Sequence, residues 1–379
     1  IKIFKEKFNN ENPEVYTSPG RVNLIGEHTD YNGSFVFPGA IDKGMIAAIR
    51  FNGTDKIRAY AIDLDESSEF GLIEEDAPNE GWAKYLFGVC REIIKRGGTV
   101  KAFDTVFAGD VPLGAGMSSS AALESTYAFA LNDLLNLGID KFELARIGQS
   151  TEHNYVGVKC GIMDQFAVVF SKPESALRLD CESLEYQHIP LLLKDYKIVL
   201  CNSNVSHNLV NSEYNVRREQ CNEGVRLISN KYPFVSSLRD VTVSILKEFK
   251  NNMPQIIYNR CLFVVQENSR VLAMCSALEK NDTLQIGDLL YQSHEGLQYL
   301  YEVSCTELDE LVGIAKKAPG VLGARMMGGG FGGCTIQFVH NSSVTAFIET
   351  IRHEYYDKYS LQENCIITEI THGVSKINV

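Results

Sequence analysis

Hydrophobic residues in the first third of the chain fall into short runs separated by turn-forming residues. Residues 43–51 and 56–62 are apolar-rich runs of this kind, and the second nearly alternates apolar with polar positions, as a half-buried β-strand does. Between residues 82 and 96 the period becomes helical, and the predicted apolar face consists of Trp82, Tyr85, Leu86, Val89, Ile93 and Ile94. The pattern predicts strands with short turns, followed by a helix.

The rest of the chain continues this mixture and becomes mainly helical after residue 211. Further strands are predicted at 103–108, 176–179, 196–201, 323–327, 334–339 and 366–370. Further helices are predicted at 121–135, 142–155, 162–170, 212–230, 256–279, 283–300, 305–316 and 344–356. The shift from strand-rich to helix-rich sequence near residue 180 predicts an α+β protein with two domains, residues 1–180 and 181–379.

Length and composition fit a globular protein with a large core. At about 100–200 residues per domain, 379 residues correspond to two or three domains, and hydrophobic residues make up 45% of them. The formal net charge of −12 argues against a broad basic patch for nucleic acid or an anionic membrane. We therefore expect any phosphate to be bound by a few local groups, such as backbone amides, a metal ion or a few cations.

Cysteine spacing and apolar runs indicate the compartment. None of the ten cysteines forms a C-x-x-C pair, so free thiols in a reducing compartment are the expectation. No apolar run approaches the ~18 residues of a membrane span, and residues 1–10 lack the apolar stretch of a signal peptide. We expect a soluble cytoplasmic protein that is a monomer or a weak oligomer.

A glycine- and serine-rich segment follows the strand predicted at 103–108. It reads Pro112-Leu113-Gly114-Ala115-Gly116-Met117-Ser118-Ser119-Ser120-Ala121-Ala122 and leads into a predicted helix. Strand, glycine turn and helix start place free backbone N–H groups at the positive end of a helix, a site suited to nucleotide phosphates. The segment is neither a Walker A loop nor G-x-G-x-x-G, and a flexible loop with serine caps is the alternative.

A second segment, residues 20–31, gathers ionisable residues around a short apolar run. It reads GRVNLIGEHTDY. A strand followed by a turn would anchor the apolar residues and leave three polar side chains free to converge: Glu27, His28 and Asp30. Because carboxylates accept hydrogen bonds from hydroxyls and histidine donates or accepts, the cluster suits a polyhydroxylated ligand. A turn with charged surface residues is the alternative.

Two acids and a glycine cluster give weaker signals. Asp164, in GIMDQF, falls in the first turn of a predicted helix, where a carboxylate usually stabilises the helix dipole by about 0.3–1 kcal/mol. Glu152, near the end of the preceding helix, is by default a surface acid. Residues 327–333 read MGGGFGG, which marks backbone that turns tightly or lies close to another group, with a simple hairpin as the alternative.

The ordered combination of these segments is more specific than any one of them. GRVNLIGEHTDY resembles the galactokinase signature, PLGAGMSSSAALE is similar to the phosphate loop of GHMP small-molecule kinases, and RMMGGGFGGC resembles that family's third motif. The resemblance implies a two-domain GHMP kinase fold with the active site in the cleft between the domains. It also implies ATP-dependent phosphorylation of galactose at the C1 hydroxyl, which yields galactose 1-phosphate and ADP.

The resemblance extends to individual residues. The residues that would hold the ATP phosphates are Gly114, Ala115, Gly116, Met117, Ser118, Ser119 and Ser120, and those that would coordinate Mg²⁺ are Ser120 and Glu152. Trp82 and Tyr85 match a segment that lies against adenine. The residues that would contact the sugar are Glu27, His28, Asp30, Gly161, Asp164 and Tyr214, and the catalytic pair would be Arg21 and Asp164.

The implied pair fits the chemistry of phosphoryl transfer, which depends mainly on positioning and charge stabilisation. An acid near the C1 hydroxyl can accept its proton, and Arg21 nearby would keep Asp164 ionised and neutralise charge on the transferring group. Whether Asp164 is a full general base or an orienting group stays open.

Two other functions remain open. One is a kinase for another sugar, such as N-acetylgalactosamine or arabinose, although Thr29 in EHTDY is the form associated with galactose. The other is a galactose sensor that binds sugar and ATP without catalysis. The uninterrupted Ser-Ser-Ser-Ala-Ala run at 118–122 and the presence of both Arg21 and Asp164 favour an enzyme.

Overall fold

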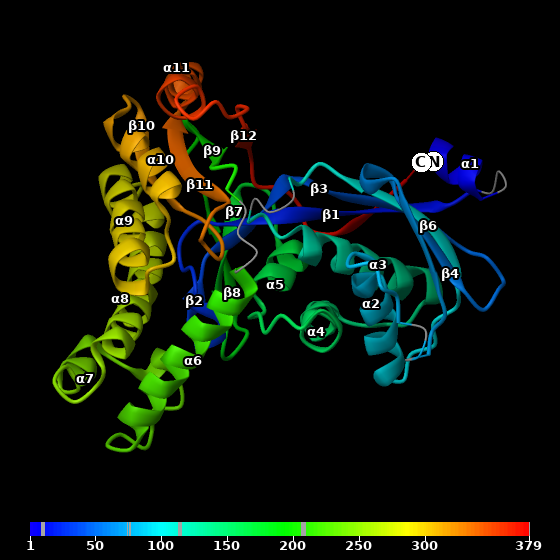
Figure 1. The fold of residues 1–379 in the computed structure, drawn as a ribbon, viewed down its shortest axis with the longest axis horizontal. Helices are drawn as coiled ribbons and strands as arrows, with labels where there is room; N and C mark the ends of the chain where they lie inside the picture. Colours follow the sequence, from blue (N-terminus) through cyan, green and yellow to red (C-terminus); the bar gives the residue numbers. More distant parts are fainter. Residues whose placement is uncertain (9–11, 74, 76, 113–115, 206–209, 379) are drawn as a thin grey trace.

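The structure is a computed structural model that describes residues 1–8, 12–73, 75, 77–112, 116–205 and 210–378 (Figure 1). Within these residues the strands form three sheets, of six, four and three strands. The chain begins with a short helix, α1 (Lys2–Lys7). The last strand lies near this helix, because Ile377 packs against the same small hydrophobic cluster as Phe4.

The six-stranded sheet is the framework of the N-terminal half. Its order is β13-β1-β3-β6-β4-β5, with β4 and β6 parallel and the other neighbours antiparallel. Its strands are β1 (Glu14–Asn23), β3 (Pro38–Phe51), β4 (Ile57–Ala61), β5 (Glu66–Phe70), β6 (Phe103–Gly109) and β13 (Ser375–Ile377). The pairing of β1 with β3 shifts between Pro19 and Arg21, and such irregularities re-aim side chains at functional sites.

Four helices cover one face of this sheet (Figure 1): α2 (Ala83–Lys95), α3 (Ser119–Leu135), α4 (Lys141–Thr151) and α5 (Met163–Phe170). Helix α3 packs directly on β1 and β3. The core between them includes Tyr16, Ile49, Phe87 and Leu131. Beside it lies the three-stranded sheet, made of β2 (Phe35–Val36), β7 (Ser175–Asp180) and β8 (Tyr186–Pro190).

The C-terminal half is built on the four-stranded antiparallel sheet, whose order is β10-β11-β9-β12. Its strands are β9 (Tyr196–Asn202), β10 (Val321–Met326), β11 (Cys334–His340) and β12 (Cys365–Thr368). Its helices are α6 (Val210–Ser229), α7 (Val243–Lys247), α8 (Gln255–Glu279), α9 (Thr283–Gly296), α10 (Thr306–Lys317) and α11 (Val344–Ile351). Helices α8 and α9 lie side by side, and α9 packs on β10.

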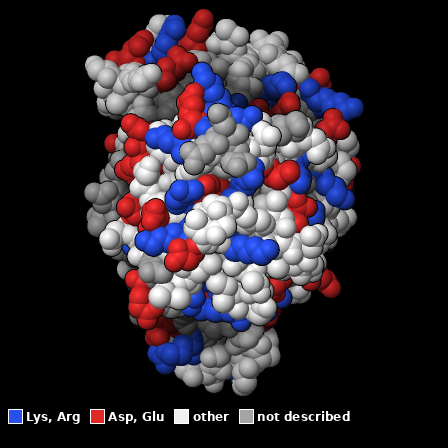
Figure 2. Space-filling view, turned by 90° about the vertical axis from the view of Figure 1, so that its right-hand side faces the viewer, with Lys and Arg blue, Asp and Glu red and all other residues white. Residues whose placement is uncertain are grey.

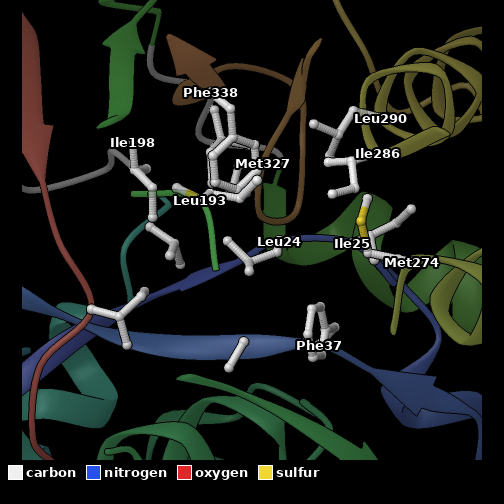
Figure 3. Packing of buried hydrophobic residues seen from close by; sticks show 14 of the residues in the cluster. Leu24, Ile25, Phe37, Leu193, Ile198, Met274, Ile286, Leu290, Met327 and Phe338 are labelled. Atoms are coloured by element: carbon white, nitrogen blue, oxygen red, sulfur yellow. The ribbon is translucent and has the colours of Figure 1, made fainter. Parts of the chain in front are cut away.

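One hydrophobic cluster joins the two halves (Figure 3). The N-terminal half contributes Leu24, Ile25 and Phe37, and the C-terminal half contributes Met274, Ile286, Leu290, Met327 and Phe338. Each of these side chains is at most 4% exposed. Because the cluster removes apolar surface of both halves from water, each half stabilises the other.

Most predicted elements are present within a few residues of their expected bounds. The helix predicted at 82–96 is α2, that at 256–279 is α8, and the strand at 334–339 is β11. Three predicted helices end in a π-helical turn, at Glu152–Val156, Leu297–Tyr301 and Arg352–Tyr356. The short strands β5, β8 and β13 were not predicted. The domain boundary at residue 180 stays a prediction, and the chain returns to the N-terminal sheet through β13.

Three further features concern possible membrane spans, the cysteines and the surface charge. In the part of the chain that the structure describes, no helix is both long and apolar enough to cross a bilayer. All ten cysteines are free. On the face shown in Figure 2, acidic and basic side chains are interspersed, so the excess negative charge is not gathered there.

The shared cluster should dominate stability. Ile286, which is fully buried on α9, and Leu284, which is 84% exposed on the same helix, form a matched pair. We expect Ile286→Ala to lower the free energy of unfolding by about 2–5 kcal/mol, because it leaves a cavity, and Leu284→Ala to change it by less than about 0.5 kcal/mol. Urea unfolding followed by circular dichroism measures both, and equal losses would show that the cluster is not the stabilising contact.

Candidate active site

The largest set of candidate residues meets at a cavity of about 380 Å³ between the two halves. Its walls come from β1 and the turn after it, the start of α3, the segment between α4 and the start of α5, the glycine cluster between β10 and β11, and two residues near and in α6, Val205 and Tyr214. The candidate residues in its lining are Arg21, Glu27, His28, Asp30, Gly116, Met117, Ser118, Ser119, Ser120, Glu152, Asp164 and Tyr214. Gly114 and Ala115 lie outside the described residues.

Arg21 and Asp164 form a bidentate ion pair in this cavity. Nε of Arg21 donates to Oδ1 of Asp164, and Nη2 donates to Oδ2, each at 2.7 Å. Nη1 donates to the carbonyl oxygen of Gly116 at 2.5 Å. Burial on its own lowers the pKa of Arg21, but the charge and hydrogen bonds of Asp164 outweigh it, so the pKa is raised and the guanidinium stays charged.

Asp164 also joins the segment 20–31 to the glycine- and serine-rich segment before α3. It lies in the first turn of α5, and the Ser118 hydroxyl donates to its Oδ2. Ser118 precedes α3 and has a positive φ of 52°, which for a non-glycine residue is an uncommon conformation found mainly at turns and functional sites. The backbone N–H of Arg21 donates to the Met117 carbonyl at 3.0 Å. The ion pair and the start of α3 therefore form one unit.

Ser120 and Glu152 meet on the other side of the helix start. The Ser120 hydroxyl donates to Oε1 of Glu152 at 2.8 Å. Burial raises the pKa of Glu152 to about 7, the hydrogen bond from Ser120 acts against this, and the charge of Asp164 adds to it. Tyr85 is hydrogen-bonded to Ser120. Behind them lies Glu124, fully buried and held by Gln165 at 2.7 Å.

Asp30 and Gly161 are in close contact. A Cβ on Gly161 would collide with the Asp30 carboxylate, so only glycine fits here. Burial raises the pKa of Asp30 to about 7, and the neighbouring charge of Asp164 adds to this rise. The charge of Asp164 therefore disfavours the ionised form of Asp30 unless a cation or a hydrogen-bond donor enters the cavity.

Glu27 is held on both carboxylate oxygens by protein groups. Oε1 accepts from the Gly328 N–H at 2.9 Å and from Nη2 of Arg325 at 3.1 Å, and Oε2 accepts from Nδ2 of Asn23 at 3.1 Å. Arg325 is fully buried in β10 and also donates to the Leu24 carbonyl at 2.8 Å. Sequence reasoning did not single out Arg325, although it is the first residue of RMMGGGFGGC.

His28 and Tyr214 face each other across the cavity wall. His28 has a positive φ of 60°, and its ring centroid lies 5.4 Å from that of Tyr214, which comes from α6. Both ring nitrogens are hydrogen-bonded within the protein, Nδ1 to the Tyr31 hydroxyl and Nε2 to the Gly329 carbonyl. Burial lowers the pKa of His28 to about 3, so the ring is neutral at ordinary pH.

Four residues singled out from the sequence lie outside the lining. They are Trp82, Tyr85, Thr29 and Gly161, which are absent from the described residues that line the cavity. Trp82 donates from Nε1 to Glu66 at 2.7 Å and packs against Phe107. The Thr29 hydroxyl is directed at two backbone carbonyls within its own turn. Thr29 therefore shapes the turn without lining the cavity, whereas Tyr85 lies close enough to Ser120 and Glu152 for both to affect its pKa.

The charges of the lining favour a ligand that arrives with a divalent cation. Of the described residues in the lining, Arg21 is the one lysine or arginine, against four acids: Glu27, Asp30, Glu152 and Asp164. A polyphosphate would be repelled here unless its charge were partly neutralised. Within the described residues, no group of three or more His, Cys, Asp or Glu side chains could hold a metal ion. Ser120 and Glu152 together provide one hydroxyl and one carboxylate.

Comparison with known proteins identifies the class. A family model described as the GHMP kinase N-terminal domain matches residues 84–172, and one of the GHMP kinase C-terminal domain matches residues 274–357. The fold also resembles that of the Methanococcus jannaschii mevalonate kinase, with a TM-score of 0.67 and 17% identity, covering 95% of this chain and 99% of that one. Fold and site thus define a kinase of the GHMP class.

The first motif narrows the class further. The galactokinase galactose-binding signature matches residues 2–51, and a galactokinase from Thermosipho africanus is 41% identical over 95% of this chain and 99% of its own length. The chain belongs to the galactokinase family of GHMP kinases. A galactokinase from Clostridium acetobutylicum is 38% identical over 99% of this chain and 97% of its own length. The crystal structure of Lactococcus lactis galactokinase complexed with galactose has a TM-score of 0.93 at 35% identity, covering 99% of this chain and 98% of that one.

The raised pKa of Asp30 predicts how stability depends on pH. Its ordinary value is 3.8 and its folded value is about 7. Between these values the unfolded chain releases the proton while the folded protein keeps it, so Asp30 lowers stability progressively as pH rises through this window. Asp30→Asn removes the effect. We expect this variant to raise the melting temperature by about 2–4 °C near pH 8, with less than half that gain near pH 5.

Thermal unfolding without ligands at the two pH values measures this effect. The exposed loop residue Asp55 supplies the control, and Asp55→Asn should leave the melting temperature unchanged at both. A gain in Asp30→Asn that is the same at both pH values would contradict the assigned pKa.

Proposed function

We propose that the protein transfers the γ-phosphoryl group of ATP to the C1 hydroxyl of galactose, giving galactose 1-phosphate and ADP. The observation that carries the proposal is the bidentate Arg21–Asp164 pair, which lines the same cavity as the start of α3, Asp30 and Tyr214. Gly161 is in contact with Asp30. A phosphate held at the helix start and a sugar held by Asp30, Gly161 and Tyr214 would meet at this pair.

In this proposal Asp164 receives the proton of the attacking hydroxyl as its oxygen bonds to the γ-phosphorus and the bond to ADP breaks. Arg21 stabilises the negative charge that spreads over the transferring group, and its planar fork suits both a carboxylate and a phosphate. Arg21 also donates a hydrogen bond to the Gly116 carbonyl, which keeps the pair in place, so little reorganisation accompanies the reaction.

The nucleotide side is assigned to the start of α3. Backbone N–H groups of the segment 114–119 would hold the phosphates, with Ser118 and Ser119 contributing hydroxyls. Ser120 and Glu152 offer the hard oxygen ligands that Mg²⁺ prefers. When bound, Mg²⁺ would neutralise part of the negative charge of the phosphates. Trp82 and Tyr85 remain our candidates for the adenine side.

The sugar side is assigned to Glu27, His28, Asp30, Asp164, Tyr214 and the backbone of Gly161. Acceptors and donors are both present in this set, as a ring of hydroxyls requires. The proposal includes a cytoplasmic location, in keeping with ten free cysteines, and action as a monomer or weak oligomer.

An ADP-release assay with MgATP tests the proposal directly. Galactose, N-acetylgalactosamine, glucose and arabinose are compared at equal concentration, and a chelator for Mg²⁺ is the cofactor control. We expect turnover with galactose and its loss on chelation. Turnover with another sugar alone would overturn the substrate assignment, and galactose binding in calorimetry without any turnover would favour the sensor.

The Asp164 carboxylate is the group whose loss should matter most. Asp164→Asn keeps the shape of the side chain and removes its charge and basicity, so we expect turnover to fall by at least about 100-fold while ATP binding changes less than threefold. Steady-state kinetics and calorimetry measure the two effects. A residual rate within about tenfold of wild type would assign Asp164 an orienting role.

A matched variant controls for the loss of an ion pair as such. Asp180 is paired with Arg239 at 2.7 Å, and neither residue lines the cavity. Asp180→Asn should leave turnover unchanged. An equal loss in this control would show that the effect at Asp164 is structural.

A further inference from the structure

Behind the sugar side of the cavity, four side chains form a continuous hydrogen-bonded chain. Nδ1 of His28 lies 2.8 Å from the Tyr31 hydroxyl, which lies 2.7 Å from the Tyr301 hydroxyl, which in turn lies 3.3 Å from Sγ of Cys221. At the other end, Nε2 of His28 lies 3.2 Å from the Gly329 carbonyl oxygen. This series of hydrogen bonds therefore links the turn after β1 with α6, the turn after α9 and the glycine cluster.

The Gly329 carbonyl determines the direction of the bonds next to it. A carbonyl oxygen can only accept, so Nε2 of His28 carries the hydrogen. The ring is neutral because burial lowers the pKa of His28 to about 3, and a neutral imidazole that is protonated on Nε2 has an acceptor at Nδ1. Tyr31 must then donate its single hydroxyl hydrogen to Nδ1.

The same rule passes along the rest of the chain. Because Tyr31 donates its one hydroxyl hydrogen to His28, its oxygen can only accept a hydrogen bond from the Tyr301 hydroxyl. Tyr301 in turn can only accept from the Cys221 thiol. Tyr301 and Cys221 are both fully buried, so water does not offer them another partner, and an unmade bond there would be costly.

We propose that Tyr31, oriented by Tyr301, is a positioning residue that holds His28 in the neutral Nε2–H form, so that the ring offers a bound ligand a hydrogen-bond donor and no acceptor. His28 and Gly329 both line the cavity, and the hydrogen between them can be shared with a hydroxyl oxygen. The statement about the sugar rests on the proposed function, whereas the tautomer does not.

This assignment changes what His28 can do. A ring with Nδ1 bonded to Tyr31 and Nε2 protonated cannot take a proton from a hydroxyl. The proton acceptors among the groups assigned to the sugar are then carboxylates, of which Asp164 is the one paired with Arg21, and His28 discriminates between ligands by what it donates to. A ligand group at that position must be able to accept.

Nuclear magnetic resonance of the ligand-free protein tests the tautomer. In protein labelled with ¹⁵N-histidine, two-bond correlations separate protonated from unprotonated ring nitrogens, and the signals missing in His28→Gln identify His28. We expect a protonated Nε2 and an unprotonated Nδ1 at neutral pH. A protonated Nδ1, or a charged ring, would overturn the proposal from the wild-type spectrum alone.

Tyr31→Phe removes the donor to Nδ1 and keeps the ring. We expect the two nitrogen shifts of His28 to move toward the average of the two tautomers and its pKa to rise, because the bond that favours the neutral form is gone. Tyr299→Phe is the control, since Tyr299 is exposed and lies two residues before Tyr301. Unchanged His28 shifts in folded Tyr31→Phe would overturn the proposal.

Kinetics tests the link to the sugar. Tyr31→Phe should raise KM for galactose about tenfold, the size of one lost hydrogen bond, with kcat changed less than threefold, and Tyr299→Phe should change neither. A fall in kcat at unchanged KM would overturn the role in binding. If wild-type protein shows no turnover of galactose, the proposed function fails while the spectrum still decides the tautomer.

Discussion

A buried guanidinium ties the active-site turn to the other half of the molecule. Arg325 comes from β10, is fully buried, and donates to backbone carbonyls of the segment that follows β1 as well as to Glu27. A charge in such a place is tolerated only when its hydrogens are nearly all used, so the turn and the glycine cluster cannot separate without stranding it. The hydrophobic cluster that includes Leu24 and Met327 lies around this contact. The hydrogen bonds of Arg325 make the association of the two halves specific, and the hydrophobic cluster makes it strong.

The cavity beside Arg325 is lined by more acidic than basic side chains. Asp30 and Glu152 have pKa values raised to about 7 through burial, and the charge of Asp164 contributes to both. Arg21 is paired with Asp164 and Arg325 with Glu27, so Asp30 and Glu152 are the described acids of the lining with which neither arginine pairs. A cation or a hydrogen-bond donor beside either one would favour its ionised form.

The sequence predicted most of the fold and singled out many of the residues that line the candidate cavity, but it revealed little of how their side chains are held in place. Long periodic segments such as α2 and α8 were predicted because their apolar spacing is repeated over several turns. The three-residue strand β13 could not be, since its place depends on pairing with a strand more than three hundred positions earlier. Site residues were found through motifs, while Arg325 and Tyr301 act through distant partners that no local pattern reveals. Thr29 shows the reverse case, because it lies inside a motif and its hydroxyl serves the backbone.

The return of the chain to its first sheet has a consequence for engineering. β13 covers the outer edge of β1, the strand that carries Arg21. If residues 375–377 were deleted, that edge would present unpaired N–H and C=O groups, a template for pairing with a second molecule. Any change to residues 375–377 must therefore keep the pairing of β13 with β1, or supply another group that covers this edge.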